Sequence, residues 1–190
     1  MRAPQELPEW ARDYSSYFGG RGMPTMPHPR SSRGPFAPPL HDPFTIRRAT
    51  VTDLPTLAVL FDGYRQFYGN TSDLVAARIF LQQRLERGES IVLLALQGIA
   101  GVGFVQLYPS FSSGAMARTF VLNDVYVQES VRRRGIAALL LQAAEQCARS
   151  EGAVRMTLST GVDNLRAQAL YESAGWQRDH AFWVYQRALR

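Results

Sequence analysis

Residues 125–141 read VYVQESVRRRGIAALLL and contain the most informative motif of the chain. This stretch begins at the end of an expected strand, residues 119–127, and passes through three consecutive arginines at 132–134. Gly135 then opens an expected helix, in which apolar residues recur at the i, i+3, i+4 and i+7 spacing of a buried face. The helix N-terminus, the close approach that glycine allows and the arginine side chains together favour binding of a phosphate group.

A solvated arginine cluster in front of an ordinary helix would explain the same residues, so the phosphate hypothesis needs independent support. NLRAQALYESAGW, residues 164–176, provides a second motif. Asn164 and Tyr171 are seven residues apart, and two helical turns place both on one face. Gly175 suits the left-handed residue that often ends a helix. An amphipathic helix with a surface tyrosine would explain the apolar positions but not the whole string.

Together, the two motifs resemble those of the GCN5-related N-acetyltransferase (GNAT) family. The spacing Arg132-x-x-Gly135-x-Ala137 is similar to the pyrophosphate loop of that family, Gln/Arg-x-x-Gly-x-Gly/Ala. Residues 164–176 fill every position of its helix motif, Asn-x-x-Ala-x-x-Leu-Tyr-Glu-x-x-Gly-Phe/Trp. The resemblance covers about residues 44–187, which is essentially the whole folded domain.

The resemblance implies an α/β domain with the GNAT fold: a mixed, twisted sheet of six to seven strands, splayed between the fourth and the fifth and flanked by four helices. Acetyl-CoA would insert in the gap, with its pantetheine arm bound like a strand to the backbone around Val125 and its pyrophosphate on the arginine loop. The residues that the resemblance assigns to acetyl-CoA are Val125, Tyr126, Val127, Arg132, Arg133, Arg134, Gly135, Ile136, Ala137, Asn164 and Tyr171.

The resemblance also implies a direct reaction, in which a neutral amine attacks the thioester carbonyl and the CoA thiolate leaves. The backbone N–H of Val125 is the expected oxyanion donor, and Tyr171 is the expected proton donor to the thiolate. A general base is needed as well, because a lysine-like amine has a pKa of about 10.4 and is mostly protonated at neutral pH. We expect no metal in this chemistry.

Asp124 is the first candidate for that base, since it directly precedes the segment expected to bind pantetheine. LNDVYV, residues 122–127, is similar to the LEDFFV of the spermidine/spermine acetyltransferases, where an acidic pair serves the polyamine. Asn123 replaces the first acid of that pair, so the assignment does not transfer directly. A strand acid paired with an arginine would also explain Asp124, and Glu89 or a water chain are the alternative bases.

Two further strings, residues 61–68 and 107–113, look like the GNAT branch that contains the yeast histone and polyamine acetyltransferases. The family places its acceptor pocket there, and aromatic rings suit a cationic amine. The candidate substrate-binding residues are Tyr64, Tyr68, Tyr108 and Phe111. Core packing explains the helical spacing of the first two equally well.

The expected function is therefore N-acetyl transfer from acetyl-CoA to a primary amine, on a small amine or an amino-acid-like molecule. Transfer to a protein, at a lysine side chain or an N-terminal amine, is the first alternative. A non-catalytic regulator that binds acyl-CoA is the second, and would follow if Tyr171 and Asp124 were misplaced.

Residue patterns along the chain predict the order β-α-α-β-β-β-α-β-α-β-β. The expected strands are residues 44–49, 89–96, 101–108, 118–127 and 154–159, followed by a hairpin at 176–187. The expected helices are residues 54–68, a helix that Thr71 or Ser72 caps and that ends at Glu86, residues 136–151 and residues 164–174. A loop is expected at 109–114.

The composition supports one such domain, at residues 43–190, behind a tail rich in proline, glycine and arginine at residues 1–42. The tail can bury little apolar surface, so we expect it to be disordered, and a start codon assigned too early would explain it equally. The net charge of +5 arises without any lysine. Arginines at a polyphosphate site and in the tail account for this charge, so we expect no nucleic-acid partner.

The single cysteine, Cys147, rules out an internal disulfide, and the three histidines lack metal-ligand spacing. The sequence has no apolar stretch of about 18 residues that could span a membrane, and no secretory apolar region in its first thirty residues. We therefore expect a cytoplasmic protein that needs no metal and no membrane, with acetyl-CoA and an amine acceptor as partners. A homodimer is left open.

Overall fold

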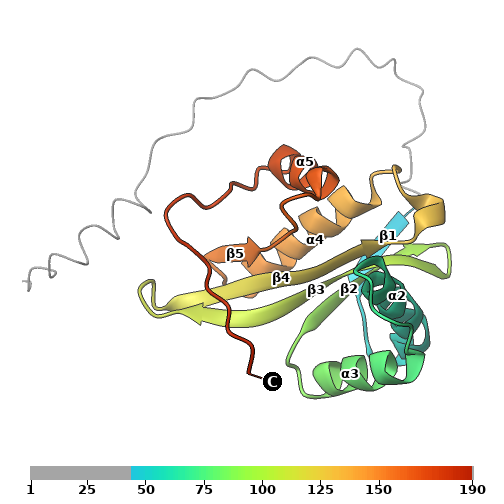
Figure 1. Cartoon of the computed structure of the whole chain (residues 1–190). Coiled ribbons are helices and arrows are strands. Elements are labelled where there is room, and N and C mark those ends of the chain that lie inside the picture. Colours follow the sequence, from blue (N-terminus) through green and yellow to red (C-terminus); the bar gives the residue numbers. More distant parts are fainter. Residues whose placement is uncertain (1–43, 190) are drawn as a thin grey trace, which may run out of the picture. The chain divides into compact units, whose positions relative to one another are not determined.

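The computed structural model describes residues 44–189, which form a five-stranded sheet with helices on both faces (Figure 1). The strands are β1 (Phe44–Arg48), β2 (Ile91–Gln97), β3 (Ala100–Ser112), β4 (Ala117–Val127) and β5 (Arg155–Leu158). The α-helices are α2 (Leu54–Phe67), α3 (Leu74–Glu86), α4 (Ile136–Ser150) and α5 (Leu165–Ser173), and short 3-10 turns lie at η1 (Val51–Asp53) and η2 (Glu129–Val131). The expected disordered tail, residues 1–42, lies outside the described residues.

The sheet is mixed, as the resemblance implies. Its strand order is β1-β2-β3-β4-β5, and neighbours are antiparallel except for the parallel pair of β4 and β5. That pair is short, since it runs from Thr119 opposite Arg155 to Leu122 opposite Leu158. Beyond Leu122, β4 continues to Val127 without a partner in β5, so the two strands separate there. The predicted splay between the fourth and fifth strands is confirmed.

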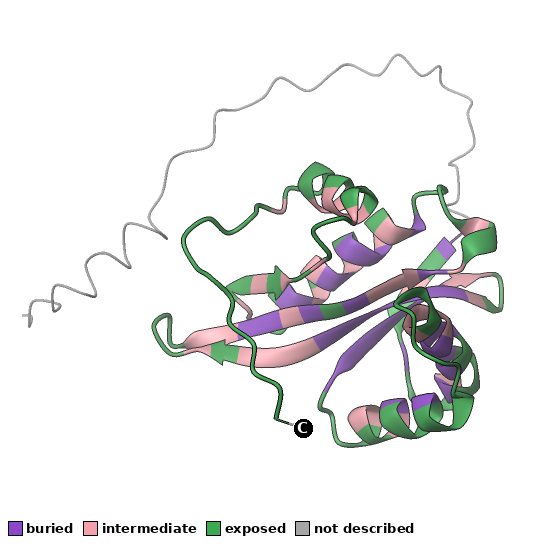
Figure 2. Ribbon diagram, viewed as in Figure 1, coloured by how far each residue is buried: buried purple, intermediate pink, exposed green. Residues whose placement is uncertain are grey.

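Each face of the sheet carries its own apolar core (Figure 2). α2 and α3 pack on one face, through Leu57, Leu60, Leu81, Leu94 and Phe104. α4 packs on the other face with part of α5, through Val105, Leu107, Phe120, Ile136, Leu140 and Ala144. Figure 1 shows these two pairs of helices on opposite sides of the sheet. β2 is apolar from Ile91 to Leu96 because its odd-numbered residues face one core and its even-numbered residues face the other.

Among the described residues the sheet has five strands rather than six or seven, because the expected hairpin at 176–187 does not form. Residues 177–189 contain no strand, and the side chains of Phe182, Trp183 and Tyr185 are exposed. Aromatic and β-branched residues are typical of a strand, but a strand needs a neighbour for its N–H and C=O groups. This segment forms no strand pair with any other part of residues 44–189, so the hairpin prediction is wrong.

β3 is longer than its sequence suggests. The prediction ended it at Tyr108 and placed a loop at 109–114, whereas the strand continues to Ser112. β4 begins at Ala117 and provides pairing partners for this extension, as far as Ser112 opposite Ala117. The proline and serine residues that favour a loop are therefore overridden by the available partner strand.

The connection between α2 and α3 is built around a buried carboxylate. Asp62 is 3% exposed and accepts hydrogen bonds from the Ser72 hydroxyl at 2.6 Å, the Asp73 N–H at 2.8 Å and the Gln66 amide at 2.8 Å. Because Ser72 is engaged there, it does not cap α3 as predicted. Asp73 is the cap instead, and its carboxylate accepts a bond of 2.9 Å from the N–H of Ala76.

Candidate active site

A β-bulge interrupts β4 one residue before Asp124. Gln106 of β3 pairs with Asp124, but the next residue of β3 pairs with Leu122, so Asn123 is an extra residue without a cross-strand partner. Before the bulge the even-numbered residues of β4 face α4, and after it the odd-numbered residues do. Asp124 is therefore turned to the face of the sheet that α2 covers.

Asp124 is a buried carboxylate, with 4% of its surface exposed. Burial raises its pKa, and hydrogen bonds from Tyr64 and Asn123 oppose part of that shift. The Asn123 amide lies 3.1 Å from Oδ1 of Asp124. No arginine contributes to the pKa of Asp124 within residues 44–189, as a structural ion pair would require. A buried carboxylate with a raised pKa is suited to accept a proton near neutral pH.

Three tyrosines lie around Asp124 on this face. Burial, and then the charge of Asp124, raise the pKa of Tyr64 in α2, and the same two causes raise the pKa of Tyr108 in β3 to about 12. Tyr64 packs edge-on against Tyr68, with 5.1 Å between the ring centroids. With raised pKa values, Tyr64 and Tyr108 remain protonated at neutral pH and can donate hydrogen bonds.

Tyr171 approaches the same region from the other face of the sheet. It lies in the last turn of α5, half-buried against the core under α4. Burial raises the pKa of Tyr171, and the neighbouring Tyr68 adds to the shift. Tyr171 in turn raises the pKa of Tyr64. These electrostatic effects indicate that Tyr171 lies near Tyr64 of α2 and near Tyr68, which follows that helix.

The arginine loop forms a turn with two left-handed residues, Arg133 with φ of +65° and Gly135 with φ of +82°. α4 begins directly after Gly135, and neither a capping side chain nor an acidic residue occupies its first turn. The first N–H groups of α4 are therefore free to bind an anion. A Cβ placed on Gly135 would meet no atom within 4 Å, so the space beside the turn is open.

Comparison with known proteins gives the family. A family model described as the acetyltransferase (GNAT) family matches residues 57–176. The chain belongs to the GNAT acetyltransferase family. An uncharacterized N-acetyltransferase, YhfO of Bacillus subtilis strain 168, is 43% identical over 140 residues, which cover 74% of this chain and 94% of that protein. A "probable acetyltransferase" of Haemophilus influenzae is 31% identical over 99 residues, or 52% of this chain and 68% of that protein.

Solved structures agree with the assignment of this chain to the GNAT acetyltransferase family. The crystal structure of a probable acetyltransferase has a TM-score of 0.74 and 47% identity, and covers 77% of this chain and 98% of that one. An aminoglycoside acetyltransferase from an uncultured soil sample, in complex with sisomicin, has a TM-score of 0.67 and 19% identity over 77% of this chain and 97% of that one. At that identity the likeness shows the fold alone. The chain is an acetyl-transferring enzyme with the GNAT fold.

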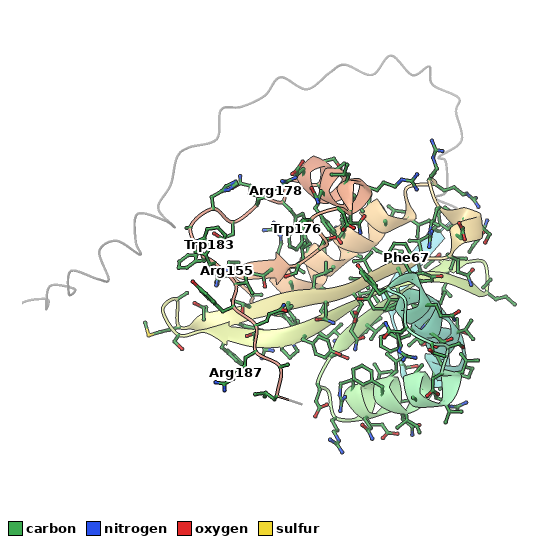
Figure 3. The ribbon with its side chains drawn as sticks, viewed as in Figure 1. Phe67, Arg155, Trp176, Arg178, Trp183 and Arg187 are labelled. Carbon is green, nitrogen blue, oxygen red and sulfur yellow. The ribbon has the colours of Figure 1, made fainter. Side chains whose placement is uncertain are left out.

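In this GNAT enzyme, Arg132 joins β4 to α2. Its Nε donates to the carbonyl oxygen of Val127 at 3.0 Å. Its guanidinium lies 5.6 Å from the ring centroid of Phe67, at the end of α2, and 5.8 Å from that of Tyr126 (Figure 3 labels Phe67). These contacts hold the side chain of Arg132 against Phe67 at the end of α2.

The other cofactor candidates differ in what they already contact. Arg134 lies over the ring of Phe44 at 4.8 Å, whereas Arg133 is exposed and has no side-chain partner among residues 44–189. Asn164 caps α5, because its side-chain oxygen accepts the N–H of Ala167 at 3.2 Å. The amide N–H groups of Asn164 donate no hydrogen bond within the described residues, and Arg133 is the arginine of this loop whose side chain pairs with no other described residue.

Phe111 and Glu89 do not join the group around Asp124. Phe111 is 71% exposed, and its ring contact is with the guanidinium of Arg118 at 5.4 Å. Glu89 is exposed and forms ion pairs with Arg84 and, at 3.8 Å, with Arg87. The carboxylate of Glu89 is thus engaged by two arginines and lies apart from the group around Asp124.

Sequence reasoning missed the groups that support this site. Gln106 is fully buried opposite Asp124; its amide donates to the Ser90 hydroxyl at 2.8 Å, and its Oε1 has no partner. The only indication of Gln106 in the sequence was that a polar residue interrupts the apolar run of β3. Glu145 of α4, which accepts a hydrogen bond from Trp176 at 3.1 Å, gave no signal because helix periodicity does not indicate partners.

Within residues 44–189, no three potential metal ligands gather into a cluster. None of the helices in this part of the chain is long and apolar enough to cross a membrane.

Proposed function

We propose that this enzyme transfers the acetyl group of acetyl-CoA directly to a primary amine of a small or amino-acid-like molecule. The observation that carries the proposal is Asp124, a buried carboxylate among tyrosines, next to the part of β4 that β5 leaves unpaired. Such a group can accept the proton that an ammonium must lose before its nitrogen becomes a nucleophile.

The separated end of the sheet fits acetyl-CoA. Residues 123–127 of β4 have no partner on the β5 side, so their backbone groups there can pair with the amides of pantetheine as with a further strand. At the same end, the Thr160 hydroxyl is buried without a hydrogen-bond partner. The free N–H groups at the start of α4 suit the pyrophosphate. When bound, acetyl-CoA supplies an acetyl group activated as a thioester.

Asp124 and the tyrosines of α2 suit a cationic acceptor. The carboxylate attracts an ammonium group. Because the pKa of Asp124 is raised, the difference between the pKa of this carboxyl group and the amine pKa of about 10.4 is smaller than for an ordinary aspartate. Tyr64 and Tyr68 present aromatic faces beside it, and such faces attract cations. Tyr171 supports the second proton transfer: with its raised pKa the phenol stays protonated and can donate its proton to the departing sulfur.

An acceptor screen tests the reaction. Released thiol is measured with acetyl-CoA and polyamines, amino acids, aminoglycosides or peptides, and we expect turnover with one or more of the small amines. Turnover with peptides alone would replace the small acceptor by a protein lysine or N-terminus. CoA binding without turnover on any amine would contradict the enzymatic proposal and favour a regulator.

Tyr171→Phe tests the proton donor. We expect kcat to fall roughly 10²–10⁴-fold, while CoA affinity remains that of the wild type. Tyr185→Phe is the matched control, because Tyr185 is an exposed tyrosine of the same domain. Near-normal turnover of Tyr171→Phe would mean that the thiolate needs no acid from the protein. The cytoplasmic location, the homodimer and the yeast histone and polyamine branch stay predictions.

A further inference from the structure

The end of α5 fixes Tyr171 and Trp176 relative to each other. Gly175 is left-handed, with φ of +89°, and its N–H donates to the carbonyl of Glu172 at 3.0 Å. The N–H of Trp176 donates to the carbonyl of Tyr171, also at 3.0 Å. These two bonds define a Schellman motif, which usually brings together the side chains of the residues at these two positions. Here the rings of Tyr171 and Trp176 are in contact, with 6.3 Å between centroids.

The indole of Trp176 is itself held by α4. Its Nε1 donates to Oε1 of Glu145 at 3.1 Å, in a part-buried hydrogen bond to a charged group (Figure 3 labels Trp176). Glu145 lies ten residues after Gly135 on the helix whose first turn is open to the cofactor phosphate, so one rigid helix spans about 15 Å between the two points. The chain of contacts runs from Glu145 through Trp176 to Tyr171.

α5 needs such an attachment because its packing is weak. None of its nine residues is buried, and its exposed Leu165 contributes nothing to the core. Leu170 and Tyr171 only border the core under α4. A proton donor must be held close to its target, since a displacement of about 1 Å can cost on the order of 10²-fold in rate. The bond between Trp176 and Glu145 compensates for the burial that α5 lacks.

We propose that Trp176 and Glu145 are positioning residues that hold the hydroxyl of Tyr171 at the reacting thioester. The proposal rests on the proposed function of Tyr171 as proton donor. Neither residue touches the substrates; each acts through Tyr171. Their removal should therefore lower kcat while leaving CoA binding and the acceptor KM unchanged.

The experiment is a double-mutant cycle on the full chain, with acetyl-CoA and an amine found in the screen. Glu145→Leu removes the acceptor, Trp176→Phe keeps the ring but loses the N–H, and Glu145→Gln keeps an acceptor oxygen. Each is made in the wild-type and the Tyr171→Phe backgrounds. Glu172→Gln is the matched control, since it removes a carboxylate of α5 that pairs with exposed Arg178 and not with Trp176.

In the wild-type background, we expect Glu145→Leu and Trp176→Phe to lower kcat roughly 10-fold, Glu145→Gln to recover most of the loss, and Glu172→Gln to have no effect. In the Tyr171→Phe background the same changes should alter kcat less than about twofold, because the group they position is gone. A loosened Tyr171 would also be more exposed, and its pKa would fall towards about 10. The alkaline loss of activity should then begin at lower pH in Glu145→Leu.

Equal losses in both backgrounds would overturn the proposal, because they would show a general structural effect. Unchanged kcat in both Glu145→Leu and Trp176→Phe would also overturn it, with the role of Tyr171 intact as long as Tyr171→Phe is slow. Wild-type kcat in Tyr171→Phe alone would instead refute the proton-donor assignment, and with it the need for positioning. Trp176→Phe and Glu145→Gln keep the test decisive if Glu145→Leu folds poorly.

Discussion

The carboxylate of Asp124 lies in a buried position, where its negative charge destabilises the folded protein. Burial raises its pKa, and the hydrogen bonds from Tyr64 and Asn123 replace only part of the lost hydration. A carboxyl whose pKa is raised on folding favours the folded state below its unfolded pKa of about 3.9, and this contribution is lost as pH rises through the folded pKa. At neutral pH the ionised group therefore works against stability, as expected where function sets the residue.

The Asp124→Asn variant should separate the effect of the buried charge on stability from its effect on catalysis. We expect the melting temperature to rise at pH 7, and the difference from wild type to become small near about pH 2.5, well below the unfolded pKa of about 3.9, where Asp124 is mostly protonated in both states. The turnover of a protonated amine should fall roughly 10²–10⁴-fold and recover partly at higher pH, where more amine is neutral. Thermal denaturation at both pH values and a pH–rate profile check this. Wild-type kinetics from about pH 6 to 9 would move the base to Glu89 or to water.

At the scale of elements, Asp62 is the group that joins α2 to α3. Hydrogen bonds from Ser72, Asp73 and Gln66 and the charge of Arg65 lower its pKa and exceed the opposing effect of burial. The stability it contributes is present above the unfolded pKa of about 3.9 and is lost as pH falls through the lower, folded pKa. The helix that carries Tyr64, and that Tyr68 directly follows, is anchored through this carboxylate.

Asp62→Asn should destabilise the domain by about 2 kcal/mol at pH 7, because an amide cannot accept all of these hydrogen bonds and leaves a buried group unpaired. Asp73→Asn is the control, since asparagine and aspartate are equally good helix caps. Urea denaturation at pH 7 and near pH 3 measures both variants. Asp62→Asn should approach the stability of wild type at the lower pH. A loss that is equal at both pH values would contradict an ionic anchor.

The turn before α4 allows a similar comparison. Gly135→Glu places an anion where we expect the pyrophosphate, and should abolish CoA binding. Gly135→Asn is the matched control, because asparagine tolerates the left-handed conformation of this residue and adds no charge. Calorimetry should find CoA affinity within about tenfold of wild type for Gly135→Asn. A folded Gly135→Glu protein with unchanged affinity would exclude the loop as the phosphate site.

At the scale of the whole molecule, sequence patterns predicted most elements because local spacing dictates them. The helical period and the two motifs located α4 and α5, and runs of apolar and β-branched residues located β2 and β4. They also placed Tyr171 and Gly135 correctly in their elements. Long-range pairing was harder: whether residues 109–112 and 176–187 form strands depends on a partner, which no local pattern encodes.

The sequence also could not predict the directions in which side chains point. Nothing in the sequence shows that Arg132 turns towards Phe67, that Phe111 points to solvent or that Glu145 meets Trp176. Such contacts join elements that are distant in the chain, so they follow from packing and not from spacing. The candidate base was identified by its neighbours in sequence, but its burial among tyrosines required the fold.

Deleting residues 1–40 tests whether the described domain is sufficient. We expect the melting temperature and the CoA affinity to remain nearly unchanged, because the deleted segment lacks the apolar periodicity of a packed element. Differential scanning calorimetry and CoA titration of the shortened protein measure this. A loss of several degrees would show that the aromatic segment at residues 10–18 docks on the domain.

The bulge at Asn123 lengthens β4 by one residue without adding a cross-strand pair. Removing Asn123 would restore regular alternation and leave the residues on both sides of it opposite the partners that they have now. Asp124 would stay opposite Gln106 on the face that α2 covers, and Val125 would stay on the face of α4. Asn123 itself is exposed and is held by one hydrogen bond to its neighbour. In an alignment of relatives, this column should therefore accept many residue types, and also a gap.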